Sequence, residues 1–454
     1  MFGLYWLLPA KWRNLFLLLA SYYFYFSYNP WFLLLLIGTS GLDYYLAKII
    51  SQTEDQIKRK VYLVLSLLSN IGVLFVFKYF VFFYNSISLI THHASLLTSL
   101  IIPAGLSFYT FQSISYTIDV YRKKYAPTDT LTDFLLYVSF FPHMVAGPVV
   151  RYNTLMPQFK VRQYFKTIDW GAFAKLTIWG FFKKMVIADN LSAIITPIFN
   201  DVHHFSGVTL LLAGFLFVIQ VYADFSGYSD IATGVAKLFG INLSLNWRRP
   251  LFSKSLHEFW TRNHISITTW FRDYLYIGLG GNRVSYQRWL LNIFLVFLIS
   301  GLWHGANFTF VIWGALHGVG FILEILFSKQ FPNFKVPKLI GWLYLITFHT
   351  LSLIAFRAIN MSDLWVIYQS IFTEFNGYQL GVELLGLKSK FYLVVCFASI
   401  VLLFAKEYQE EFNPLHSERK WIAEVIKPLF FILALVSLFI LGNFNANQFI
   451  YFQF

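Results

Sequence analysis

The sequence predicts an all-α polytopic membrane protein, and three observations carry this prediction. The 454 residues are 57% hydrophobic and only 13% charged, about half the charged share of a soluble domain. The apolar residues stand in long runs, and since each span needs ~20 of them, about ten to twelve transmembrane helices are expected. Basic residues gather in alternate connections, as the positive-inside rule requires. We expect one membrane domain over residues 1–454, surrounded by membrane lipid.

The N-terminal part contains four expected spans whose basic connections share one face. Lys11 and Arg13 precede the first span, and Lys58 and Lys60 separate the second from the third, so these connections are predicted to be cytoplasmic. No basic region or cleavage site precedes the first apolar residues, so this segment is expected to stay in the membrane rather than act as a signal peptide. The four spans are Leu15–Tyr28, Trp31–Ala47, Val61–Ile90 and Leu100–Val120.

The next apolar stretch, Leu131–Val150, is predicted to be broken. Pro142, Gly147 and Pro148 interrupt it, and basic residues flank both of its ends. We therefore expect it to dip into the membrane and return rather than to cross. Because non-helical backbone at membrane depth is tolerated only where protein or a water-filled cavity surrounds it, the sequence predicts re-entrant or broken helices that form a cavity.

The rest of the chain combines further apolar runs with one amphipathic stretch. Between Leu243 and Trp289, arginines are interleaved with Trp, Phe and Tyr, a composition typical of interfacial helices at the cytoplasmic face. The remaining spans are expected at Phe173–Phe199, Val208–Tyr222, Leu290–Trp303, Phe308–Phe327, Leu339–Arg357, Phe391–Ala405 and Ile426–Gly442.

Charge and cysteine content exclude other classes of protein. The net charge of +13, from 35 Lys and Arg against 22 Asp and Glu, would favour a nucleic-acid partner in a soluble chain. Here membrane topology accounts for it, so no nucleic acid is expected. The single cysteine, Cys396, lies in an apolar run, which excludes an internal disulfide and a cysteine metal cluster. No metal site is predicted.

His304 is the first candidate catalytic residue. It stands in the glycine-containing segment Gly301–Asn307, and a helix that leaves the cytoplasmic interface near Leu290 would rise only ~20 Å before reaching it. Since the hydrocarbon core is ~30 Å thick, His304 is expected at membrane depth, where an ionisable residue marks a functional site by default. A histidine bonded to a neighbouring carbonyl is the structural alternative. His317 stands in a similar glycine-flanked setting.

His264 is the second candidate. His257 precedes it by seven residues on one helical face, which resembles metal-ligand spacing only loosely, so proton transfer or substrate positioning is the preferred role. The segment from Asp224 to Asp230 is rich in glycine and hydroxyl groups and is expected to be an unwound element facing the cavity, with ion pairing as the alternative. Two function classes stay open: a membrane enzyme that transfers a group, and a transporter whose histidines relay protons.

Several long motifs resemble the membrane-bound O-acyltransferase (MBOAT) family, and within it the bacterial alginate O-acetyltransferase branch. They follow one another in order over nearly the whole chain, which makes the signal more specific than any single motif. The motifs are Ser107–Arg122, Phe140–Arg151, Asp224–Asp230, Glu258–Trp260, His264–Ser266, Trp270–Tyr276, Gly280–Arg283, Gly301–Asn307 and Gln448–Phe454.

The resemblance implies an enzyme that moves an acyl group, expected to be acetyl, from a cytosolic thioester such as acetyl-coenzyme A to a hydroxyl for the O-acetylation of an exported polysaccharide such as alginate. By matching position it implies that His304 is the catalytic histidine and His264 a second important one. It also implies no bound cofactor, an extracytoplasmic partner acetyltransferase of the SGNH type, and the bacterial cytoplasmic membrane as location. D-alanyl transfer to teichoic acid, by a related branch, is the alternative.

The chemistry of acyl transfer suggests roles for other residues. With His304 as general base, the tetrahedral oxyanion needs hydrogen-bond donors, for which His264, Trp303 and Asn307 are candidates.

Three further residues are candidates for substrate binding. Arg151 and Arg272 are candidates to attract a phosphate-bearing donor to the cytoplasmic mouth, although positive-inside topology also accounts for such arginines. Asp224 belongs to the acidic segment that is expected to face the cavity.

Overall fold

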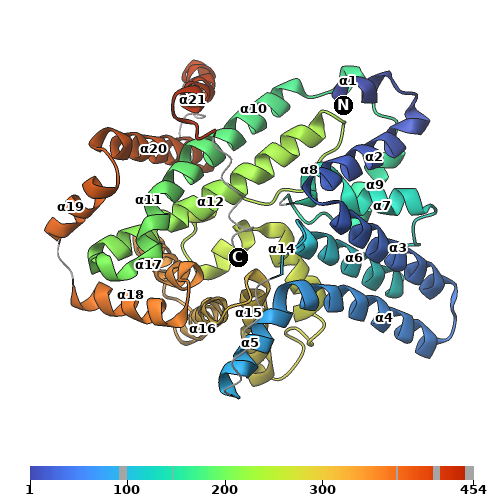
Figure 1. Cartoon of the computed structure of the whole chain (residues 1–454), viewed down its shortest axis with the longest axis horizontal. Coiled ribbons are helices and arrows are strands. Elements are labelled where there is room, and N and C mark those ends of the chain that lie inside the picture. The colour runs from blue at the N-terminus through green and yellow to red at the C-terminus, as the bar shows by residue number, and fades with distance from the viewer. Residues whose placement is uncertain (92–99, 146, 375–376, 413–419, 445–454) are drawn as a thin grey trace. The chain divides into compact units, whose positions relative to one another are not determined.

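The computed structural model describes residues 1–91, 100–145, 147–374, 377–412 and 420–444, so the motif Gln448–Phe454 lies outside the described residues. Every regular element within these ranges is a helix (Figure 1). Seven of them are long and apolar enough to cross a membrane, judged by length and composition: Pro30–Gln52, Gln56–Ser88, Gly207–Lys237, Tyr286–His304, Phe308–Gln330, Lys338–Arg357 and Lys390–Phe412. The predicted all-α membrane class is confirmed.

The chain divides into two compact units. The first contains Met1–Ala174 and Ala232–Leu245, and the second contains Lys175–Ile231 and Asn246–Phe454. Two of the boundaries lie inside the helices α10 (Trp170–Phe181) and α12 (Gly207–Lys237). Each unit contains candidate membrane spans, so neither has the composition of a separate soluble domain.

The first unit is built from short and long helices around a polar contact. The Asp43 carboxylate accepts hydrogen bonds from Ser66 (2.6 Å) and Asn70 (2.9 and 2.8 Å), which joins α3 to α4. Its elements are α1 (Phe2–Leu7), α2 (Ala10–Tyr28), α3 (Pro30–Gln52), α4 (Gln56–Leu74), η1 (Phe75–Tyr79), α5 (Phe80–Ile90), α6 (Leu106–Tyr121), α7 (Leu131–Ser139), α8 (Phe141–Met144), α9 (Tyr152–Lys160) and η2 (Phe165–Thr167).

The stretch that was expected to be broken is divided between α7 and α8, with a short non-helical segment after Met144. The break begins at Phe140, which precedes the helix carrying Pro142. A proline removes a backbone donor and fits best in the first turn of a helix. The prediction of a broken element between Leu131 and Val150 is therefore confirmed.

The second unit contains most of the candidate membrane spans. After the end of α10 come η3 (Phe182–Ala188), α11 (Asp189–Asn200), η4 (Val202–His204) and α12; then η5 (Pro250–Phe252), α13 (Leu256–Arg262), α14 (Ile265–Trp270), η6 (Phe271–Tyr276), α15 (Tyr286–His304), α16 (Phe308–Gln330), α17 (Lys338–Arg357), α18 (Met361–Thr373), α19 (Gly377–Leu387), α20 (Lys390–Phe412) and α21 (Lys420–Leu441). The stretch predicted to be interfacial thus forms short helices between α12 and α15.

The segment from Asp224 to Asp230 is helical, so the expected unwound element is wrong. Lys184 lies 2.8 Å from Asp224, and Lys183 lies 2.7 Å from Asp230. Both lysines come from η3, a π-helical segment, which is the kind of local bulge that re-aims side chains. Both carboxylates therefore have a cationic partner, and α12 is continuous through this segment.

The helices α15 and α16 pack against each other through backbone atoms. A Cβ atom added to Gly301 would lie 2.3 Å from the Phe310 carbonyl oxygen, and one added to Gly314 would lie 2.5 Å from the Phe297 carbonyl oxygen. Only glycine allows two helices to approach this closely. The crossing fixes the end of α15 against the first turns of α16.

Replacing Gly314 by alanine should therefore destabilise the protein by about 1–3 kcal/mol, the usual effect of overpacking. The measurement is the Tm of the purified protein in detergent. Gly381→Ala is the matched control, because a Cβ at Gly381 in α19 meets no atom within 4 Å, and alanine is the better helix former. Equal Tm values for the two variants would contradict the close crossing.

Candidate active site

A cavity of about 660 Å³ lies within the second unit. One wall is a single face of α15, where the lining residues recur at helical spacing from Trp289 through Ile293, Phe297 and Ser300 to His304. At 1.5 Å per residue this face extends for about 22 Å. The other walls come from α12, from the short helices α13, α14 and η6, and from α16 and α17. The cavity is therefore elongated and mostly apolar.

The segment that joins α15 to α16 holds His304 in place. His304 is the last residue of α15, and Gly305 continues in an extended conformation. Asn307 then caps α16, because its side-chain oxygen accepts a hydrogen bond from the Thr309 N–H (3.1 Å). The Asn307 amide nitrogen donates to the carbonyl oxygen of Ile359 (2.8 Å), which ties this turn to the chain beyond α17.

Aromatic rings surround the His304 imidazole. Its centroid lies 4.6 Å from Trp303, 4.9 Å from Trp313 and 5.3 Å from Phe356, each in an edge-on arrangement. Of these neighbours Trp313 and Phe356 line the cavity, as does His304 itself. The ring is thus held by contacts on several sides while it faces the cavity.

His264 lines the cavity as the residue that precedes α14, with a positive φ of 44°. Its Nδ1 lies 3.1 Å from the side-chain oxygen of Asn246. That oxygen also accepts from the Ser266 backbone N–H (3.2 Å), which can only donate, and from the Ser266 hydroxyl (2.9 Å). The Asn246 atom is therefore an acceptor, and Nδ1 of His264 carries the proton.

The surroundings of His264 favour its neutral form. The side chain is 5% exposed, and the indole of Trp247 stacks on the ring at 5.5 Å. Burial lowers the pKa of His264 to about 3, because the charged form loses its hydration. With the proton on Nδ1, the Nε2 atom has the lone pair. His264 is equipped to accept a hydrogen bond from a ligand through Nε2, not to donate one.

Four further rings form what we call the indole–imidazole cluster: Trp260, Trp313, His317 and His349. The His317 centroid lies 5.3 Å from Trp260, 4.6 Å from Trp313 and 5.3 Å from His349. The Nε2 of His317 is 3.2 Å from the Ser352 hydroxyl. Within the described parts of the chain, the Nε1 atoms of Trp260 and Trp313 and the Nδ1 atom of His317 are buried without a hydrogen-bond partner. All four residues line the cavity.

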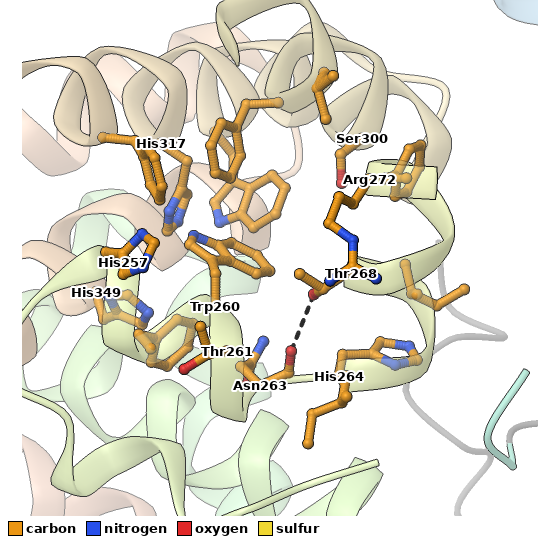
Figure 2. A pocket seen from close by; sticks show the side chains of 18 of the residues that line it. His257, Trp260, Thr261, Asn263, His264, Thr268, Arg272, Ser300, His317 and His349 are labelled. Carbon is orange, nitrogen blue, oxygen red and sulfur yellow. Dashed lines mark hydrogen bonds between the residues drawn. The ribbon is translucent and has the colours of Figure 1, made fainter. Parts of the chain in front are cut away.

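Figure 2 shows the two sides of this cavity. His317, His349 and His257 lie on one side and His264 and Arg272 on the other, with Trp260 projecting between them. Arg272 has a side chain that is 61% exposed and lies 2.8 Å from Asp273. It is the only Lys or Arg among the described lining residues. The positive charge of Arg272 therefore lies at the solvent-exposed edge of the cavity, and the other described lining residues include no Lys or Arg.

The structure brings some predicted site residues to the cavity and places others elsewhere. His304, His264 and Arg272 line it, whereas Trp303 and Asn307 flank His304 without lining it. Asp224 is 2% exposed and pairs with Lys184. Arg151 belongs to the first unit, immediately before α9. In the described ranges, no group of three or more His, Cys, Asp or Glu residues is arranged to hold a metal ion.

Sequence reasoning missed Trp260, Trp313 and His349 as cavity residues. Trp313 and His317 are four residues apart on α16, so helical spacing places them on one face, and this signal could have extended the site from His317. His349 had no such signal. It comes to the cavity through the packing of α17 against α16, which a lone histidine in an apolar run does not predict.

Comparisons with known proteins agree with the motifs. The family model described as "MBOAT, membrane-bound O-acyltransferase family" matches residues 127–362. The "Probable alginate O-acetylase AlgI" of Pseudomonas aeruginosa is 40% identical over 84% of this chain and 73% of its own length. The protein of the same name in Pseudomonas putida is 34% identical over 100% of this chain and 96% of its own length. The "Peptidoglycan O-acetyltransferase" of Helicobacter pylori is 36% identical over 79% and 72%, respectively.

The buried neutral His264 should make stability depend on pH. The unfolded chain binds a proton at this residue near pH 6.5, whereas the folded protein does so only near pH 3. Stability is therefore lost as pH falls from about 6.5 toward 3, by roughly 2 kcal/mol at pH 5 from this group. The measurement is the change in Tm between pH 7.5 and pH 5, which should be smaller for His264→Gln than for the wild type. The same change in both proteins would contradict a buried neutral His264.

Proposed function

The chain belongs to the membrane-bound O-acyltransferase family, and from this premise we propose that it transfers an acetyl group from a cytosolic acyl thioester to a hydroxyl for the O-acetylation of an exported cell-envelope polysaccharide. The relatives support the acceptor class, because two are named for alginate and one for peptidoglycan. The proposed location is the bacterial cytoplasmic membrane, where a multi-pass enzyme has access to a cytosolic donor. Acceptor sugars outside the membrane would then be reached from the opposite face.

The observation that carries the proposal is His304 at the end of α15, facing an elongated cavity that His264 also lines. In the proposed reaction His304 removes the proton from the acceptor hydroxyl as its oxygen attacks the thioester carbonyl carbon. The C–S bond then breaks, and the thiolate takes the proton from His304. The transfer needs a base and oriented groups but no metal or bound cofactor. His264, with its lone pair on Nε2, supports the proposal as an acceptor that orients the hydroxyl.

The shape of the cavity supports a linear acyl thioester as donor. The cavity has a volume of about 660 Å³, and its wall along α15 extends for about 22 Å. Acetyl-coenzyme A or another thioester on a comparable arm fits this description, while a folded bulky ligand does not. Arg272 at the exposed edge supports a donor that carries phosphate, because guanidinium groups bind phosphate in a bidentate geometry.

We further propose that a separate extracytoplasmic acetyltransferase of the SGNH type completes delivery to the polysaccharide. This proposal rests on the family resemblance and on the location of the acceptor sugars. An acetyl group that is transferred within the membrane must still reach a sugar outside it. The proposed reaction involves no nucleic acid, because the basic residues of a membrane protein of this kind interact with anionic lipid and with the acyl thioester.

Replacing His304 by alanine should abolish acetylation of the envelope polysaccharide, with a loss of at least about 10²-fold, the usual contribution of a general base. The measurement is ester-linked acetate released by mild alkali, with the abundance of the protein in membranes as control. Normal acetate at normal abundance would remove His304 from the mechanism. A response confined to D-alanine esters would assign the chain to teichoic acid modification, and substrate flux in liposomes without acyl transfer would favour a transporter.

Replacing Arg272 by glutamine should raise the KM for acetyl-coenzyme A about 3- to 10-fold with little change in kcat, because one phosphate contact at an exposed site is lost. The effect should shrink at high ionic strength, where exposed charges are screened. Arg283→Gln is the matched control, since Arg283 is an exposed arginine of the same connection that does not line the cavity. The same KM for both variants would remove Arg272 from donor binding.

A further inference from the structure

Acyl transfer by the proposed mechanism creates a negatively charged oxygen, the oxyanion, in the tetrahedral intermediate. The site needs a hydrogen-bond donor that stabilises this oxygen. In such reactions preorganised hydrogen-bond donors aimed at the developing charge supply much of the rate enhancement. The question therefore rests on the proposed function, and it asks which protein group near His304 has a hydrogen to give. The donor must line the cavity, lie close to the general base and have no partner elsewhere in the protein.

The candidates expected from the sequence do not meet these conditions. The Asn307 amide already donates to Ile359 at 2.8 Å, and its oxygen accepts from Thr309. Trp303 does not line the cavity. The Nδ1–H group of His264 donates a hydrogen bond to Asn246, and the low pKa of His264 leaves its Nε2 atom without a proton at neutral pH.

We propose that the indole N–H of Trp313 is the hydrogen-bond donor that stabilises the tetrahedral oxyanion. Trp313 lines the cavity and is 4% exposed. Its ring centroid lies 4.9 Å from that of His304, with the ring planes at 82°. Its Nε1 is buried and makes no hydrogen bond to any described residue. An indole nitrogen can only donate, so this group is an unsatisfied donor beside the general base.

Packing holds the Trp313 ring in one orientation. Its centroid lies 4.6 Å from His317, 5.5 Å from Phe356 and 6.1 Å from Trp260. On the backbone side, the close contact of Gly314 with α15 fixes the first turns of α16. The donor is therefore preorganised, which is the condition under which a single hydrogen bond contributes most to a transition state.

Trp260 has the same kind of unpartnered nitrogen but lies farther from the reaction. Its Nε1 is also buried without a partner in the described parts of the chain. Its ring contacts are with Phe259, Phe297, Trp313 and His317, and none is with His304. Figure 2 shows Trp260 projecting into the middle of the cavity. Of the two indole donors, Trp313 is the one adjacent to the base.

The reaction step is balanced with this assignment. The acceptor oxygen forms a C–O bond with the thioester carbonyl carbon, and its proton moves to His304. The carbonyl π electrons move to the carbonyl oxygen, whose negative charge is stabilised by the Trp313 N–H without proton transfer. When the C=O bond reforms, the C–S bond breaks, and the thiolate leaves with the proton from His304. Trp313 returns to its initial state unchanged.

The test removes the N–H group while keeping the ring. Trp313 is replaced by 3-benzothienylalanine, an isostere with sulfur in place of the N–H, and in a second variant by phenylalanine. The full-length protein in lipid nanodiscs is assayed by thiol release from acetyl-coenzyme A, with alginate oligosaccharides supplied as the hydroxyl acceptor. Both variants should lower kcat by about 10²-fold and leave KM within about threefold, because the oxyanion exists only in the transition state and the intermediate.

Two controls separate the possible results. Trp365→Phe, at a residue on α18 that is 71% exposed, should keep the wild-type kcat. The isostere at Trp260 should lower kcat much less than the isostere at Trp313. If the Trp313 isostere retains kcat within twofold, or changes KM alone, the assignment of Trp313 is overturned. If the wild-type protein releases no thiol in a His304-dependent manner, the proposed function itself fails, and the assignment fails with it.

Discussion

The site depends on the close crossing of α15 and α16 at Gly301 and Gly314. A side chain at either position would meet a backbone carbonyl at 2.3 or 2.5 Å, so the two helices approach through backbone atoms alone. Membrane helices gain little from hydrophobic burial against each other and associate through such close contacts. The crossing fixes His304, at the end of α15, relative to the face of α16 that carries Trp313 and His317.

Several charged side chains of the second unit that do not line the cavity form ion pairs: Lys183 with Asp230, and Lys184 with both Asp189 and Asp224. At the cavity, the indole–imidazole cluster keeps ring nitrogens that no described residue satisfies. Each unsatisfied buried group costs about 1–3 kcal/mol. A fold can keep such unsatisfied ring nitrogens where a ligand, rather than another protein group, forms hydrogen bonds with them.

The sequence predicted the features that follow from local patterns and missed those that depend on distant partners. Long apolar runs predicted the seven helices that are long and apolar enough to cross a membrane, and the glycine-containing segment placed His304 at the end of an apolar run. Asn307 stands directly before a helix, where its side chain is a common N-cap, so the hydrogen bond that it accepts from the Thr309 N–H was within reach of sequence reasoning. The pairing of Asp224 with Lys184 was not, because it joins residues 40 positions apart in the chain.

An uncharged hydrogen-bond donor to the oxyanion suits this cavity for electrostatic reasons. A buried Lys or Arg beside the oxyanion would have to lose its hydration before substrate arrives, and that desolvation is costly without a partner. It would also stabilise the deprotonated form of a neighbouring histidine and weaken it as a base. An indole N–H avoids both effects. The chain has 35 Lys and Arg, yet among the described lining residues only Arg272 is one of them. In the proposed mechanism, the positive charge at the exposed edge attracts the acyl thioester, while an uncharged indole N–H stabilises the oxyanion inside the cavity.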